Sequence, residues 1–388
     1  MYLDRRWGDI TLNLEVQPRL NDFYRVTEKL PEVKLQAQEF QLGESDFYYQ
    51  GQNSYSYLTR KYAGEAAARY ESGRFDTFHQ LSYSRKFFGW LNILPSASLR
   101  YDFYTRGPDR SEDPESGEET PEPSPTPEPV EERDFWRRVF SAGLGLSTDI
   151  YGIFPVRTEW LDIDRLRHVI TPSVNYVFTD NPTVDSEDIY QFDSIDKINR
   201  RNYFLLTLRN RLQTKRGSEE KGKSSWTLAD LTISTPLYTR PERDNSDRLI
   251  GDLSGNLKIN PYPSTGLNLD LLYDSYDNRI KRDTLDLWVR PDDDWWVTFS
   301  HSYRFDKDRN QVSAEVYLRA NPVWAFKVYG RYDTVGGRFE EESFTIYRDF
   351  HCWSSSLQFE TRPDEDEYTF FLSFWIKEFS QAPLRLSN

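Results

Sequence analysis

The last third of the chain, residues 249–378, is built from short segments in which apolar and polar side chains alternate with a period of two. Such a period places successive side chains on opposite faces of a β-strand, so the pattern predicts strands and not helices. One segment shows the alternation clearly, with these apolar residues at every second position: Val312, Ala314, Val316, Leu318 and Ala320. Few residues separate one segment from the next, which predicts a series of antiparallel β-hairpins.

The turns and the ends of these segments indicate a membrane protein. Short turns, such as residues 261–264 and 291–294, alternate with longer ones, such as residues 276–281 and 306–310. Strands of about 9–12 residues with one apolar face are typical of a bilayer-spanning β-barrel. Aromatic residues stand at the segment ends, as in the interfacial girdles of such barrels: Trp295, Trp296, Tyr303, Trp324 and Trp353.

The composition fits a wall that is apolar outside and polar inside. The hydrophobic fraction of 37% is low for a chain of 388 residues, whereas the aromatic fraction of 16% is high. The net charge of −14, with no run rich in Lys or Arg, argues against a nucleic-acid partner. No apolar run is as long as a membrane-spanning helix, so a membrane protein with this sequence must span the bilayer as a closed barrel.

We therefore predict an all-β fold, a transmembrane antiparallel outer-membrane β-barrel of about 18 strands that occupies residues 1–388 as one domain. The first strand is expected at residues 10–16, and residues 151–165 are expected to connect two strands. Residues 107–134 are rich in proline and glutamate, which predicts a disordered acidic external loop. Residues 180–200 are expected to form a second long external loop.

The start of the chain bears on export. Residues 1–7 contain no apolar core of a signal peptide, which an outer-membrane protein needs. We therefore expect this sequence to be a C-terminal fragment and its barrel to be incomplete.

Residues with catalytic or metal-binding chemistry are few. The four histidines, His79, His168, His301 and His351, do not occur at metal-ligand spacing, and Cys352 is the single cysteine. The sequence contains no nucleophile-elbow or phosphate-loop motif. A hydrolase built on the barrel wall would need a serine on a strand beside His301. The sequence therefore predicts no enzyme, no cofactor and no metal site.

Several segments resemble the LptD (OstA) family of outer-membrane barrels. The most specific one contains Arg167, His168, Thr171 and Pro172, because a proline inside a strand removes a ladder hydrogen bond and is rare there. Three further segments are similar to the family: residues 30–35, the phrase Gln191-Phe192-Asp193 followed by Asp196 and Ile198 with Asn202 beyond it, and residues 347–353.

The resemblance implies a translocon that inserts lipopolysaccharide into the outer leaflet of the outer membrane, without covalent chemistry. It also implies an LptE-like lipoprotein plug and an LptA-like periplasmic bridge protein, the latter bound through an N-terminal periplasmic domain that we expect to be missing here. In the family, adjacent cysteines near the end are linked by disulfides to the N-terminal part. His351 stands at the first of these positions, so the resemblance implies a disulfide from Cys352 to a partner outside this chain, with a free thiol as the alternative.

Two other functions fit the same pattern. A diffusion porin or another outer-membrane channel has the same alternation, with a closed wall and an inward-folded loop. A soluble secreted β-protein that binds carbohydrate also alternates. The resemblance favours the translocon over both.

Overall fold

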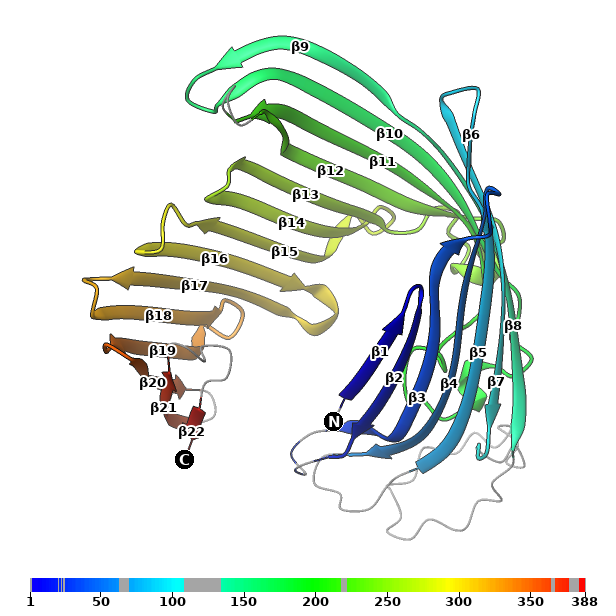
Figure 1. Ribbon diagram of the computed structural model, residues 1–388, viewed down its shortest axis with the longest axis horizontal. Coiled ribbons are helices and arrows are strands. Elements are labelled where there is room, and N and C mark those ends of the chain that lie inside the picture. Colours follow the sequence, from blue (N-terminus) through cyan, green and yellow to red (C-terminus); the bar gives the residue numbers. More distant parts are fainter. Residues whose placement is uncertain are drawn as a thin grey trace. The chain divides into compact units, whose positions relative to one another are not determined.

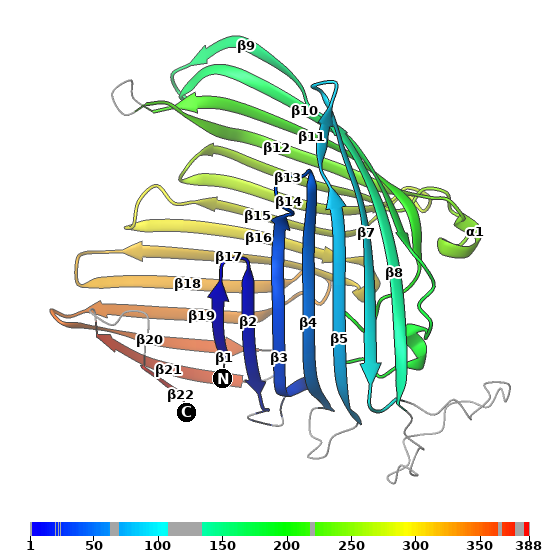
Figure 2. The same cartoon turned by 45° about the vertical axis from the view of Figure 1, so that its right-hand side comes forward.

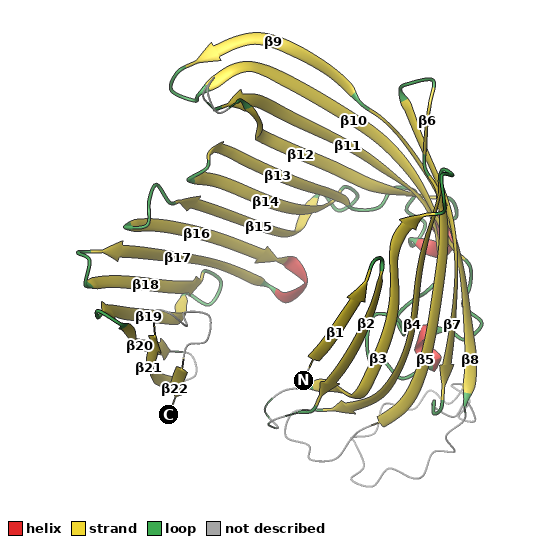
Figure 3. Ribbon diagram, viewed as in Figure 1, coloured by secondary structure: helices red, strands yellow, loops and turns green. Residues whose placement is uncertain are grey.

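The structure is a computed structural model, in which strands make up most of the described chain (Figure 3). It describes residues 2–19, 21, 23, 25–62, 70–107, 134–217, 222–363, 367–376 and, for the backbone alone, 384–387. The chain divides into two compact units. Unit 1 comprises residues 1–148, 174–205 and 238–249, and unit 2 comprises residues 149–173, 206–237 and 250–388.

Unit 1 is an antiparallel sheet of long strands, coloured blue to cyan in Figure 1. Its strands are β1 (Tyr2–Trp7), β2 (Ile10–Gln17), β3 (Val26–Gln41), β4 (Phe47–Lys61), β5 (Tyr70–Tyr83), β6 (Arg85–Phe87), β7 (Leu91–Tyr104) and β8 (Phe135–Thr148). Neighbours in the chain pair with one another, except that the short β6 extends the ladder in which β5 pairs with β7.

Three strands contribute residues to both units: β10 (Ile163–Thr179), β11 (Arg201–Arg216) and β12 (Ser224–Tyr238). The other strands of unit 2 are β9 (Ile150–Thr158), β13 (Leu253–Tyr262), β14 (Thr265–Asp274), β15 (Arg279–Val289), β16 (Trp295–Arg304), β17 (Arg309–Arg319), β18 (Trp324–Asp333), β19 (Arg338–Asp349), β20 (Trp353–Arg362), β21 (Glu367–Ile376) and β22 (Leu384–Ser387). From β13 onward they form successive antiparallel hairpins (Figure 2).

The register keeps like residues on one face of the sheet. Val316 lies opposite Val297 in β16 and opposite Val328 in β18, so the three valines form one row. Val316 is 44% exposed and Val328 is 51% exposed. A row of exposed valines is unfavourable in water and favourable against lipid.

Unit 1 shows the same arrangement, in which the apolar face is exposed and the polar face is buried. Tyr55 and Phe75 are 46% and 39% exposed, whereas their chain neighbours Ser56 and Asp76 are fully buried. A water-soluble sandwich would bury the apolar side chains instead. The sheet therefore has the faces of an outer-membrane wall, as predicted.

One edge of unit 2 carries an aromatic band on its exposed face, near the short turns that follow β15, β17 and β19. Trp295 and Trp353 are 40% and 38% exposed, and the Phe350 and Trp353 rings stack with centroids 3.8 Å apart. The Arg348 guanidinium lies 4.9 Å from the centre of the Trp324 ring. Aromatic and Arg side chains at a strand end are typical of the membrane interface.

The helices of the described residues are short: η1 (Ser186–Asp188), α1 (Pro241–Asp244) and η2 (Phe305–Lys307). Within the part of the chain that the structure describes, no helix has the length and apolar character to cross a membrane.

The all-β antiparallel prediction is confirmed, but the described residues form 22 strands rather than about 18. The four additional strands are β1, β6, β9 and β22. Residues 10–16 were expected to form the first strand, but they belong to the second strand, β2. β1 precedes it, and every residue of β1 pairs with β2. β3 begins at Val26.

The connection predicted at residues 151–165 is also wrong, since most of it is β9. Gly152 and Pro155 weaken the strand signal in this segment, because glycine packs poorly and proline cannot donate to a ladder. The structure accommodates Pro155 at a register shift between Asp164 and Leu166 of β10, where Arg165 has a φ of 60°. A bulge of this kind leaves the proline without a ladder partner.

Candidate functional site

The candidate functional site lies on the polar face of unit 1, where residues 180–200 fold back onto the strands. This connection between β10 and β11 starts along β8, because the backbone N–H of Asp180 donates to the carbonyl of Phe140 at 2.9 Å. Its apolar residues turn inward, so that Ile189 is 4% exposed and Phe192 is 6% exposed. A long connection was predicted here, and the structure shows that it packs against the sheet. Its location outside the cell stays a prediction.

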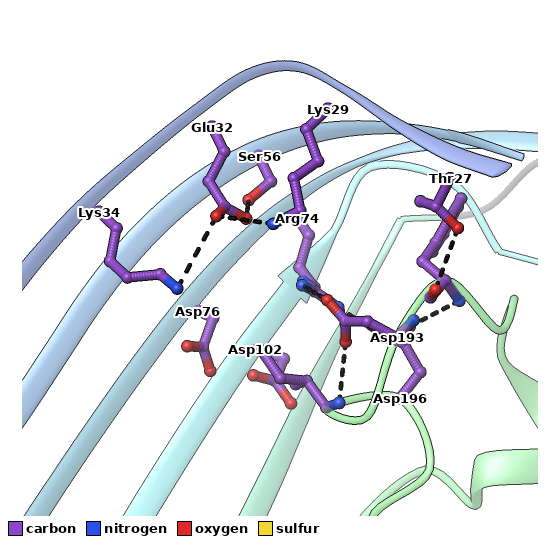
Figure 4. Close-up of polar contacts among 12 residues, drawn as sticks. Thr27, Lys29, Glu32, Lys34, Ser56, Arg74, Asp76, Asp102, Asp193 and Asp196 are labelled. Carbon is purple, nitrogen blue, oxygen red and sulfur yellow. Dashed lines mark hydrogen bonds and ion pairs between the residues drawn. The ribbon is translucent and has the colours of Figure 1, made fainter. Parts of the chain in front are cut away.

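Arg74 of β5 is the centre of the contacts between this loop and the sheet (Figure 4). Its two terminal nitrogens bind the Asp193 carboxylate at 2.9 and 2.5 Å, and Nη1 also donates to Asp196 Oδ1 at 2.9 Å. Arg74 is 1% exposed and Asp196 is fully buried. A guanidinium matches a carboxylate in a two-pronged contact, so the pair fixes orientation as well as distance.

The Asp196 carboxylate accepts hydrogen bonds from three donors besides Arg74. The Tyr104 hydroxyl of β7 donates to Oδ1 at 2.6 Å, and the backbone N–H groups of Phe192 and Asp193 donate to Oδ2 at 2.8 and 2.9 Å. This carboxylate therefore closes the turn of its own loop while it binds two strands. A buried carboxylate needs such partners, because an isolated charge in a dry site is strongly unfavourable.

Arg137 of β8 binds the loop through backbone carbonyls. Its Nε donates to the carbonyl of Val184 at 3.0 Å and its Nη1 to that of Ile195 at 3.0 Å, while Nη2 donates to the carbonyl of Ile198. Asp102 of β7 lies 3.9 Å from the same guanidinium, and both side chains are fully buried. Arg137 thus supplies donors to carbonyls that would otherwise lack partners in an irregular, buried segment.

An aromatic contact completes the packing at the loop's centre. The rings of Tyr70 and Tyr190 stack with centroids 4.5 Å apart, and Phe192 meets Tyr70 edge-on at 5.3 Å. The Tyr70 hydroxyl donates to the carbonyl of Gln191 at 3.1 Å, and Thr27 Oγ1 of β3 donates to that of Phe192 at 3.1 Å. The loop is therefore held by β3, β5, β7 and β8 together.

The polar face continues beyond the loop on β3 and β4. Glu32, which is 6% exposed, accepts from Lys29 Nζ at 3.0 Å and from Ser56 Oγ at 2.9 Å, and Lys34 Nζ lies 3.8 Å away (Figure 4).

We name Arg74, Tyr104, Arg137, Asp193 and Asp196 the latch, since these five residues join the loop to the sheet.

Asp193 is one of the two acidic residues of the latch, and the charges around it favour its charged form. Burial disfavours this carboxylate, but the hydrogen bond and positive charge of Arg74 outweigh burial and lower the pKa of Asp193 below its ordinary value. No group of three or more His, Cys, Asp or Glu suitable for a metal ion occurs among the described residues. The latch can hold a charged loop in place, and it brings together no nucleophile and base.

The residues singled out in the sequence lie elsewhere, on β10. Arg167 lies 4.9 Å from the centre of the Tyr151 ring, and His168 Nε2 lies 3.3 Å from Asn210 Oδ1. Thr171 Oγ1 donates to Asp149 Oδ1 at 2.5 Å, and Pro172 follows in the same strand. These four residues belong to unit 2, whereas the latch belongs to unit 1, and a functional role for Arg167, His168, Thr171 and Pro172 stays a prediction.

The latch residues Arg74, Tyr104 and Arg137 were missed. A usable signal was available, because an arginine in the middle of an otherwise alternating strand needs a buried partner. The phrase that contains Asp193 and Asp196 had been identified only as a family resemblance. Neither signal identifies which strand the loop contacts.

His301 and Cys352 are the other two candidates from the sequence. Both ring nitrogens of His301 are occupied, Nδ1 by Asp283 Oδ2 at 2.7 Å and Nε2 by Asn310 Oδ1 at 2.9 Å, so its partners are not serines. Cys352 is an exposed free thiol in the turn between β19 and β20, with His351 Nδ1 3.1 Å from its sulfur. A disulfide from Cys352 to a cysteine outside this chain stays a prediction.

Comparisons with known proteins give one family. The sequence model of a family described as LptD protein matches residues 3–230, which is more than half of the 388 residues. None of the curated protein sequences matches this chain.

Solved structures with a similar fold share little sequence with the chain. The copper transporter OprC is 11% identical over 94% of this chain and 67% of its own, with a TM-score of 0.34. A mutant ferric enterobactin receptor PfeA from Pseudomonas aeruginosa, in complex with enterobactin, is 10% identical over 97% and 68%, with a TM-score of 0.34. Likeness at this level carries no argument about function.

Proposed function

Because the chain belongs to the LptD protein family, and is therefore an outer-membrane β-barrel protein of the lipopolysaccharide-transport type, we propose that it inserts lipopolysaccharide into the outer leaflet of the outer membrane. The observation that carries the proposal is the family match over residues 3–230. The inverted faces of the sheet support it independently, because a wall with apolar residues outside and polar residues inside suits a protein in lipid.

In this proposal the polar face of the wall serves the sugar head group of the lipid. Hydroxyl-rich sugars need hydrogen-bonding partners when they leave water, and the polar face offers Ser, Thr, Asp, Glu and Arg side chains. The acyl chains pass sideways into the bilayer, where their burial is favourable. Chemistry on the lipid is not required, so the activity proposed is transport.

The loop at residues 180–200 has a role in the same proposal. Since it covers the polar faces of β5, β7 and β8, it reduces the access of small solutes to that part of the wall. The latch holds it with buried charges, so release of the loop needs a change in those contacts. We propose that the loop limits leakage while the remaining polar face stays available to substrate.

Family membership implies lipopolysaccharide and other proteins of the same transport complex as partners. We propose an LptE-like lipoprotein plug and an LptA-like periplasmic bridge protein in particular. Purification of the full-length protein from native membranes tests this part, since a preparation without a stoichiometric lipoprotein would contradict the plug.

Depletion of the full-length protein in cells tests the proposed transport. Surface lipopolysaccharide should fall as the protein is depleted, and a plasmid copy of the wild-type chain should restore it. Unchanged surface lipopolysaccharide after complete depletion would overturn the proposal.

A diffusion porin is the second candidate, and the inward-packed loop at residues 180–200 is the observation that favours it. A porin would conduct ions steadily in planar bilayers, and its depletion would slow the uptake of small solutes while surface lipopolysaccharide stayed constant. The two functions thus give opposite results in the same depleted cells. The family match favours the translocon.

A further inference from the structure

Unit 2 contains a cavity of about 480 Å³ on its polar face, near the short turns that follow β15, β17 and β19. Its volume lies within the range of roughly 300–1,000 Å³ of small-molecule sites. The lining residues that matter most are three cations and three aromatic residues: Arg290, Arg319, Lys327, Trp296, Tyr317 and Tyr347. Neither the latch nor the residues singled out on β10 contribute to it.

The aromatic residues of the cavity form a platform. The rings of Trp296 and Tyr317 lie nearly parallel, at 10°, with centroids 5.7 Å apart. Tyr347 meets Tyr317 edge-on at 6.1 Å. Trp295 lies on the exposed face, as expected for an interfacial residue, but Trp296 is on the opposite, polar face, where no lipid can anchor it. Aromatic rings in a polar cavity are suited to pack against the faces of a sugar.

The cations of the cavity are only partly neutralised. Arg290 lies 3.4 Å from Asp293, and both side chains are largely exposed; Arg319 lies 4.0 Å from Asp294 and also contacts the side chain of Tyr317. A guanidinium has five N–H donors, so these contacts leave donors for a ligand. Lys327 binds Glu315 at 3.1 Å and keeps two further donors.

We propose that this cavity binds a phosphorylated sugar. The sugar ring packs on Trp296 and Tyr317, and the phosphate accepts hydrogen bonds from Arg319 and Lys327, because cationic donors bind phosphate oxygens most strongly. Phosphorylated glycolipid head groups and free sugar phosphates share this chemistry. Insofar as the sugar belongs to lipopolysaccharide, the inference deepens the proposed function and rests on it.

Binding by the purified chain in detergent tests the inference, with isothermal titration as the readout. The probes are a bis-phosphorylated glucosamine disaccharide, the same disaccharide without phosphate, glucose 6-phosphate and inorganic phosphate. The bis-phosphorylated disaccharide should bind most tightly. The double variant Arg319→Gln/Lys327→Gln should weaken its binding at least about tenfold, as expected for the loss of charge-assisted hydrogen bonds. Trp296→Leu should weaken both disaccharides.

The matched control is Arg209→Gln, since Arg209 forms an exposed two-pronged ion pair with Asp230 on β12, away from the cavity. All variants are first checked for heat-modifiable migration, so that a folding defect is not mistaken for lost binding. Equal binding of the phosphorylated and unphosphorylated disaccharides, or wild-type binding by the double variant, would overturn the inference.

The probes also separate the possible sources of the sugar. Tighter binding of glucose 6-phosphate than of the disaccharide supports the cavity and assigns it to free sugar phosphates. Binding is measured without cells, so it is independent of lipopolysaccharide transport. A protein that binds the disaccharide, but whose depletion leaves surface lipopolysaccharide unchanged, supports this inference and overturns the proposed function.

Discussion

The polar face of unit 1 is buried by the chain itself, whereas the polar face of unit 2 carries an open cavity. Among the described residues, nearly all of the largest fully buried side chains belong to unit 1, and only Thr345 and Asp274 belong to unit 2. The long connection at residues 180–200 supplies the cover in unit 1. The hairpins from β13 onward are joined mostly by turns of a few residues, which cannot fold back over the sheet.

The two units differ in the solvent exposure of their ion pairs, and this changes how much each pair contributes to stability. Arg74 and Asp196 are almost completely removed from solvent, whereas Lys327 and Glu315 in unit 2 have side chains that are 25% and 26% exposed. Breaking a buried pair leaves an uncompensated charge, which is costly. Breaking an exposed pair changes stability little, because water replaces the partner. The same alternating pattern thus gives a buried polar face in unit 1 and an accessible polar face in unit 2.

Arg74→Ala should produce the largest effect, because it leaves the fully buried Asp196 and the partly buried Asp193 without their cation. We expect docking of the loop to weaken by about 3–5 kcal/mol, the usual cost of removing one partner of a buried pair. Limited proteolysis of the protein in detergent should then cleave within residues 180–200. Heat-modifiable migration should persist, since the ladders of unit 1 do not depend on Arg74.

Arg209→Ala is the control for that experiment. Arg209 and Asp230 also form a two-pronged pair, but the Arg209 side chain is 45% exposed. Its removal should change stability by about 0–1 kcal/mol and leave the cleavage pattern unchanged. If Arg74→Ala left residues 180–200 as resistant as in the wild type, the latch would not be what holds the loop.

The next largest effect should come from acid, through Asp193. Burial favours its neutral form, but Arg74 outweighs burial and lowers the pKa of Asp193. A group whose folded pKa is lowered contributes stability that is present above its unfolded pKa and is lost as pH falls through the folded pKa. Docking of the loop should therefore be constant between about pH 7 and 5 and weaken below about pH 4.

A spin label at Ser194→Cys, in a Cys352→Ser background, measures this, because Ser194 is exposed beside Asp193. Label mobility should rise in acid, whereas a label at Asn321→Cys in unit 2 should show no such change. The side chain of Asp193→Asn is neutral and does not titrate, so a label in this variant should be equally mobile at pH 7 and in acid. An identical acid response in Asp193→Asn would assign the effect to another group.

The sequence predicted the strands better than the packing of residues 180–200 on the polar face of unit 1. Alternation identified the strands of unit 2 because short turns leave little choice of register, and rows such as Val297, Val316 and Val328 fix which face meets lipid. β9 was missed because Pro155 hides a strand that only the bulge opposite it allows. The latch was missed for another reason. Residues 74 and 193 are far apart in the chain, and periodicity says nothing about contacts between a loop and a distant strand.

The smallest effect should come from deletion of residues 114–129, which lie outside the described residues. Their proline and glutamate content cannot bury a core, so no packing should be lost in either unit. The deletion roughly halves the connection between Tyr104 and Phe135, and halving a loop changes its closure free energy by about 0.6 kcal/mol. Heat-modifiable migration and the protease resistance of residues 180–200 should both match the wild type. Loss of the folded form on this deletion would show that the two long connections of unit 1 both support its sheet, and that the loop at residues 180–200 is not alone in covering the polar face.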